Sequence, residues 1–169
     1  MGRHEEALKI LHGGTVIPAI PLVLDENRKF NEAGQRTLIR YYLDAGVGGL
    51  AVAVHTTQFE IRKPEVGLFE PVLRVTKEEM DAYEARTGKT LVRVAGGEAE
   101  QACAEARTAK ALGFDAVLLS PGGLAHRTEE ELVERTHAVA AEMPVIGFYL
   151  QTACGGRRLS YEYWKAVAD

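Results

Sequence analysis

Apolar runs of strand type that end abruptly in small polar or glycine-rich residues recur along this chain, and this repetition limits it to few folds. Such runs occupy residues 49–54, 92–95, 116–119 and 145–148. Strands this uniformly apolar are typical of a parallel sheet covered by helices on both faces. Because the carboxyl ends of parallel strands meet at one edge, we expect the polar residues that follow them to share one face.

Helix signals alternate with these runs. A further strand is expected at residues 15–20, and a helix starting near Asn31 follows it. Two segments match the capping-box pattern, one at Thr76 and one at Thr128. The first predicts a restart or bend within a helix over residues 69–86, and the second predicts the start of a helix that runs to about residue 142. Two more helices are expected over residues 98–112 and after Ser160. The result is five βα units in a single domain, residues 1–169.

Composition narrows the function classes. The chain has 169 residues, 46% of them hydrophobic and 26% charged, with a formal net charge of -4. The basic residues form no stripe, so no nucleic-acid partner is expected. No apolar run approaches the roughly 20 residues that span a bilayer, and the amino terminus lacks the apolar core of a signal peptide. We therefore expect a cytoplasmic protein with no membrane partner, which suits its two unpaired cysteines, Cys103 and Cys154.

Two folds compete at this stage. Five βα units in about 150 residues suit a flavodoxin-like open sheet, whereas a complete (β/α)8 barrel typically needs about 250 residues. Length alone favours the open sheet.

A set of motifs that occur in a characteristic order reverses the preference for an open sheet. They are Gly14-Thr15 with Pro18 and Pro21, residues 45–50, His55-Thr56-Thr57-Gln58, Val94-Ala95-Gly96-Gly97, Ser120-Pro121 and Phe148-Tyr149. In this order the chain resembles the dihydrodipicolinate synthase and N-acetylneuraminate lyase family from about Thr15 onward. The resemblance implies a partial (β/α)8 TIM barrel in the α/β class, with the first five βα units present and the chain ending before the sixth strand.

The family resemblance also implies roles for three residues. Thr56 and Thr57 match the threonines of the turn that binds the pyruvate carboxylate, and Tyr149 matches the general acid and base. Thr57 and Tyr149 are thus the expected catalytic residues, and Thr56 and Thr57 the expected substrate-binding residues. Consecutive backbone N–H groups in a tight turn suit a carboxylate, and a phenol can pass protons during imine formation. The implied partners are a 2-oxo acid, an aldehyde and further copies of the chain, without a cofactor.

Several positions depart from the family pattern. His55 and Gln58 stand where the family has glycines, and after the fourth strand Pro121-Gly122-Gly123 replaces a Pro-Tyr-Tyr motif, so Gly123 stands at the place of the relay tyrosine. The arginine that holds the aldehyde's carboxylate has no counterpart after Tyr149. The family's Schiff-base lysine lies on the sixth strand and is absent from this sequence. Lys165 is expected on a surface helix and does not replace it.

Two functional hypotheses remain open. One is a Schiff-base (class I) aldolase or lyase that joins or splits a 2-oxo acid and an aldehyde. The other is a non-catalytic carboxylate-binding barrel relative, or an inactive fragment. No metal site is expected, since the histidines show no metal-ligand spacing. Glu60 and Arg62 are expected to form a surface ion pair.

Overall fold

A computed structural model describes residues 2–169 of the chain. Four parallel strands form one sheet in the order β1-β2-β3-β4. These strands are β1 (Gly49–Val52), β2 (Val92–Gly97), β3 (Ala116–Leu119) and β4 (Val145–Gly147). The helices are α1 (Arg3–Gly13), α2 (Glu32–Asp44), α3 (Phe69–Thr87), α4 (Ala102–Ala111), α5 (Glu129–Ala140) and α6 (Tyr161–Ala168). Short 3₁₀ turns are η1 (His55–Thr57), η2 (Phe59–Arg62), η3 (Ala99–Gln101) and η4 (Thr152–Cys154).

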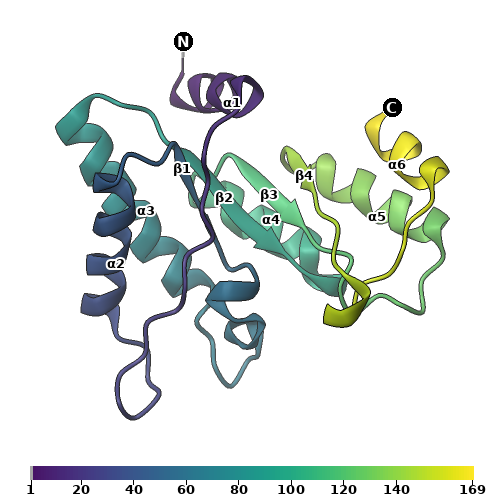
Figure 1. The fold of residues 1–169 in the computed structure, drawn as a ribbon, viewed down its shortest axis with the longest axis horizontal. Helices are drawn as coiled ribbons and strands as arrows, with labels where there is room; N and C mark the ends of the chain where they lie inside the picture. Colours follow the sequence, from purple (N-terminus) through teal and green to yellow (C-terminus); the bar gives the residue numbers. More distant parts are fainter. Residues whose placement is uncertain (1) are drawn as a thin grey trace.

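The strand order follows the chain, as in a barrel. An open flavodoxin-like sheet would place its first strand between the second and third, in the order 2-1-3-4-5. Here each strand instead pairs with the next one in sequence. Figure 1 shows α2 and α3 beside one edge of the sheet, α5 and α6 beside the other, and α1 across the amino ends of the strands. The chain therefore has the α/β architecture of the first part of a (β/α)8 barrel.

The expected strand at residues 15–20 is reduced to a bridged extended segment. It runs parallel to β1 through one bridge, Ala19 with Ala51, where the Ala51 N–H donates to the Pro18 carbonyl at 2.9 Å. Pro18 has no N–H to extend the ladder toward the amino end. At the other end Ala53 takes a φ of 61° and turns the chain away. Our expectation of five full strands is therefore corrected to four strands and this segment.

The two faces of the sheet have separate cores. One face packs against helices α2 to α5 and contributes Leu50, Val52, Ala95 and Val117. The other face gathers Ala51, Val92 and Val94 with Ala7 of α1. The sequence did not lead us to expect α1, although Ala7, Ile10 and Leu11 follow the i, i+3, i+4 spacing of a buried helix face.

Most of the predicted helix starts are confirmed. Asn31, Thr128 and Ser160 each accept a hydrogen bond from a backbone N–H of the first turn of α2, α5 and α6. The prediction at Thr76 is wrong, because α3 is continuous there. The Thr76 hydroxyl is buried and donates to the Val72 carbonyl at 2.8 Å within the helix. Apolar residues on both sides of Thr76 continue the buried face of the helix, so nothing interrupts it.

No helix among residues 2–169 is both long and apolar enough to cross a lipid bilayer.

Candidate functional site

A cavity of about 130 Å³ lies at the carboxyl ends of the strands. Its lining comes from the ends of β1, β2, β3 and β4 and the turns that follow. The lining residues are Ala19, Ala53, Val54, His55, Thr56, Phe59, Gly96, Gly97, Glu98, Leu118, Ser120 and Phe148. At about 30 Å³ per water molecule, this space holds roughly four waters, which suits a ligand of only a few heavy atoms.

The backbone is strained around this cavity. Four non-glycine residues of the described chain have a positive φ, and three of them, Ala53, Gln58 and Ala99, lie in the turns that build or flank the cavity. Such conformations cost roughly 1–3 kcal/mol each and persist where the surrounding structure enforces them, often at functional sites. Strain here supports a built site rather than a loose set of loop ends.

The Arg62 side chain links the turns that follow β1 and β2. Its Nε donates to the Glu105 carboxylate at 2.6 Å, and one terminal nitrogen donates to the carbonyls of Ala53 at 2.6 Å and Gly96 at 3.0 Å. The other Glu105 oxygen accepts the Glu98 N–H at 2.8 Å. One buried ion pair thus ties together the ends of β1 and β2 and the start of η3. Arg62 and Glu60 do not form the expected surface pair, because Glu60 pairs with Lys63.

Glu98 and Ser120 supply the polar groups on the β2 and β3 side of the cavity. Burial raises the pKa of the Glu98 carboxyl, while the nearby Arg62 guanidinium and a hydrogen bond from Ser120 act in the opposite direction. The Ser120 hydroxyl also accepts the Gly122 N–H at 3.0 Å, which directs its proton to Glu98. Sequence reasoning noted Gly96-Gly97 and Ser120-Pro121 only as motifs at strand ends and missed the pairing of Glu98 with Ser120. The signal was present, since Glu98 and Ser120 each directly follow a buried strand.

Aromatic side chains also line the cavity. Phe59 and Phe148 line it, and the His55 ring lies edge-to-face on Phe59 with 5.5 Å between ring centroids. The Arg62 guanidinium lies 5.9 Å from the centroid of the Phe59 ring. The accessible lining of the cavity is therefore mostly apolar with a few polar groups among it, as is usual in small-ligand sites.

The three sequence-predicted site residues take different places. Of the described residues, the cavity lining includes Thr56 but neither Thr57 nor Tyr149. Thr57 is fully buried, and its hydroxyl donates to the Ile20 carbonyl at 2.7 Å. Tyr149 is half exposed and directly follows Phe148, which lines the cavity.

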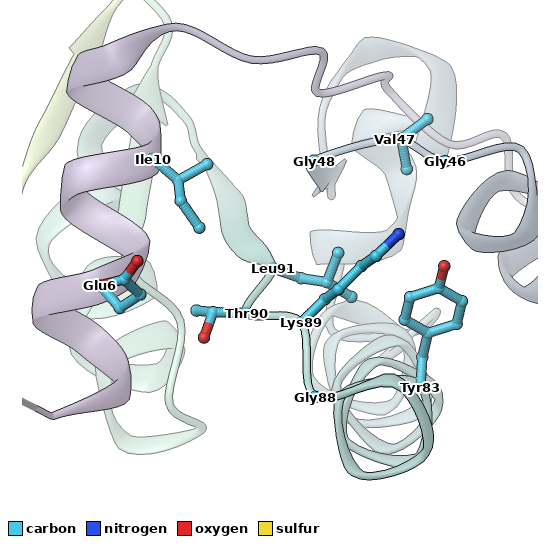
Figure 2. A pocket seen from close by; sticks show the side chains of 10 residues that line it. All are labelled: Glu6, Ile10, Gly46, Val47, Gly48, Tyr83, Gly88, Lys89, Thr90 and Leu91. Atoms are coloured by element: carbon cyan, nitrogen blue, oxygen red, sulfur yellow. The ribbon is translucent and has the colours of Figure 1, made fainter.

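A larger depression, of about 550 Å³, lies at the amino ends of β1 and β2. Figure 2 shows Glu6 and Ile10 entering it from α1, with Tyr83 and Lys89 on the other side. In α/β barrels the amino-terminal end serves stability, whereas ligands bind at the carboxyl ends. We therefore assign the candidate site to the smaller cavity.

Comparisons with known proteins agree with the barrel-type fold described above. No protein-family model matches the chain. An uncharacterized DapA-like lyase of Rhizobium meliloti is 34% identical over 129 residues, which are 74% of this chain and 40% of the relative. The resemblance of this chain to the dihydrodipicolinate synthase and N-acetylneuraminate lyase family, expected from the motifs, is thereby confirmed for the amino-terminal portion.

Solved structures agree in fold. The sialic acid aldolase of Ruminococcus gnavus, in a catalytic lysine mutant, matches with a TM-score of 0.76 and 19% identity over 94% of this chain and 51% of its own. YagE of E. coli K12, of the dihydrodipicolinic acid synthase family and solved with pyruvate, matches with a TM-score of 0.74 and 20% identity over 90% of this chain and 49% of its own. The chain spans about half the length of these solved relatives.

Proposed function

We propose that this chain, which matches the amino-terminal part of the dihydrodipicolinate synthase and N-acetylneuraminate lyase family in sequence and fold, binds a 2-oxo acid such as pyruvate in the cavity at the carboxyl ends of its strands. It contributes that site to a Schiff-base aldolase or lyase reaction between the oxo acid and an aldehyde. The observation that carries this proposal is the position of Thr56, which lies after β1 within a family-like motif and lines a cavity of pyruvate-like size.

In this proposal the Thr56 hydroxyl exchanges its long hydrogen bond to the Ile20 carbonyl, 3.4 Å, for one to the ligand's carboxylate, and Thr57 fixes the turn. The Thr57 hydroxyl joins η1 to the Ile20 carbonyl, so it holds the Thr56 backbone at the cavity. Tyr149 acts as proton donor and acceptor once its side chain turns toward the ligand, a rearrangement for which its exposure leaves room. The aromatic side chains of the lining pack against the ligand's methyl group.

The imine-forming lysine has no counterpart at the cavity. Of the described residues that line it, none is a lysine, and Lys165 is exposed on α6. Imine formation needs an amine desolvated inside the pocket, and a solvated ammonium group on a surface helix is a poor nucleophile. This observation favours a second candidate function for the chain as it stands, a carboxylate-binding barrel relative without catalysis.

Reduction with borohydride in the presence of pyruvate separates the two. We expect the 169-residue chain to show no pyruvate adduct by mass spectrometry. A longer polypeptide that adds a lysine-bearing sixth strand should be modified stoichiometrically. An adduct on the short chain would show that the nucleophile lies elsewhere than proposed.

Reversible binding tests the site itself. Replacing the Thr56 hydroxyl in Thr56→Val should weaken pyruvate binding roughly 10- to 100-fold, the usual worth of a hydrogen bond to a charged group. Thr37→Val, on the exposed face of α2, is the matched control and should bind as the wild type does. Equal affinity in both variants would contradict the role of Thr56.

The proton-transfer role needs the longer polypeptide. There, Tyr149→Phe should slow turnover roughly 10²- to 10⁴-fold, because a positioned proton donor usually contributes that much. Oxo-acid affinity should stay unchanged, which distinguishes a role in chemistry from a role in binding.

We further propose that the protein acts in the cytoplasm and assembles with copies of itself. Cys103 and Cys154 are both free thiols, which suits a reducing compartment.

A further inference from the structure

The Glu98 carboxyl occupies an unusual position for an acidic group in a site that takes an anion. It lines the same cavity as Thr56 and His55. It also fills the space beside Gly122, where an added Cβ would lie 2.7 Å from the Glu98 Oε1 atom. The loop after β3 therefore carries no side chain at Gly122, and Glu98 supplies the functional group there.

Charged groups face Glu98 from three surrounding elements. Arg62 of η2 and Arg135 of α5 contribute positive charge, and Glu105 of α4 contributes negative charge. Arg62 is already neutralised by Glu105, since their side chains are paired at 2.6 Å and both are more than nine-tenths buried. His55 lines the same cavity from η1 and is the other ionisable side chain among the residues that line it.

We propose that Glu98 takes up one proton from solvent when a 2-oxo acid anion enters the cavity, so that binding of the anion is coupled to protonation of this residue. The inference rests on the proposed function and adds a regulatory property to the same site.

The physical reason is repulsion between like charges in a partly desolvated space. A second carboxylate next to Glu98 favours the protonated form of one of the two. Burial already raises the pKa of Glu98, so it is the group that accepts the proton. Once neutral, its O–H can donate a hydrogen bond to the ligand, as carboxylic acids kept neutral in other sites do.

The coupling has a fixed sign. Since the anion raises the pKa of Glu98, protonation of Glu98 must strengthen anion binding by the same factor. Affinity should therefore fall as pH rises through the free protein's Glu98 pKa, approaching about tenfold per pH unit for one proton. Replacing the carboxyl by an amide removes the repulsion and the coupling together.

The test is pyruvate binding by the 169-residue chain, followed by calorimetry in a pH series from about 5, just above the ordinary carboxyl range, to about 8. Proton uptake is measured directly from the heats in buffers of different ionisation enthalpy. We expect uptake approaching one proton in the wild type and a fall in affinity with pH. Glu98→Gln should show a flat profile and tighter binding at the upper end of the range.

Two controls assign the proton. Glu100→Gln removes an exposed carboxyl two residues away, which pairs with Arg127, and should keep the wild-type profile. His55→Asn changes a residue of the cavity lining, so its affinity can differ, but its proton uptake should remain that of the wild type. A flat profile in His55→Asn, with the slope retained in Glu98→Gln, would overturn the inference.

The remaining outcomes are distinguishable. If the wild type binds pyruvate with no proton uptake, the proton coupling is wrong and the proposed function stands. If it binds no pyruvate at any pH, the proposed function fails and the coupling fails with it. The calorimetric uptake needs no variant, so the presence or absence of proton coupling is measurable even if Glu98→Gln fails to fold.

Discussion

The Arg62 guanidinium and the Glu105 carboxylate form an ion pair at 2.6 Å beneath the candidate site, with only 6% and 7% of their side chains exposed. A buried pair adds little over an apolar pair of the same shape, but removing one partner leaves an uncompensated charge. The position of this pair, between the ends of β1 and β2, makes it a brace for the site.

Breaking this ion pair should destabilise the fold strongly. Arg62→Met leaves Glu105 unpaired and should lower the free energy of unfolding by about 3–5 kcal/mol, measured by urea denaturation. The matched control is Arg74→Met, in an exposed i,i+4 pair with Glu70, and should cost no more than about 1 kcal/mol. Equal losses in the two variants would contradict the brace.

Gly96 should tolerate no side chain. A Cβ at this position would collide with the Ala53 carbonyl, which is backbone and cannot move aside. Gly96→Ala should lower the free energy of unfolding by roughly 1–3 kcal/mol through overpacking. Gly13→Ala, where a Cβ meets no atom within 4 Å, should be neutral or stabilising. A neutral Gly96→Ala would show that the close approach of β1 and β2 is wrong.

Glu79 should contribute to stability in a pH-dependent way. Hydrogen bonds from Arg40 and then Arg36 lower the pKa of this carboxyl, against an opposing effect of burial. A group whose folded pKa is lowered stabilises the fold above its unfolded pKa of about 4.3 and loses this contribution as pH falls through the folded value. Glu79→Gln should therefore be less stable than the wild type near neutral pH, and the difference should shrink in acid. A gap that stays constant from neutral pH to about pH 3 would contradict the linkage.

The sequence correctly predicted those features of the fold that depend only on residues close together in the chain. The caps at Asn31, Thr128 and Ser160 depend on one side chain and the next turn, so their sequence signals were sufficient. Thr76 carries the same pattern but lies within a continuous buried helix face, where packing outweighs a cap. The strand expected at residues 15–20 forms only one bridge with β1, because Pro18 has no N–H to donate. Strand pairing depends on such hydrogen bonds with the partner strand as well as on the apolar pattern of the segment.

The site was predictable only in outline. Polar strand ends indicated which edge of the sheet to examine, and Thr56 and Glu98 do meet there. The pairing of Arg62 with Glu105 joins residues 43 positions apart, so no local pattern reveals it. Helix α1 was readable from its apolar spacing, yet its role in covering one face of the sheet depends on contacts with β2 that only the fold brings about.

Titration of the ¹⁵N-labelled chain with pyruvate, followed residue by residue by NMR, tests most directly whether the oxo-acid site lies at the carboxyl ends of the strands. We predict saturable amide shifts at Thr56, Gly97 and Ser120, which line the small cavity, and unchanged amides at Gly88 and Lys89, which line the amino-end depression. Shifts centred on Gly88 and Lys89, or no saturable shift at any residue, would contradict the proposed site.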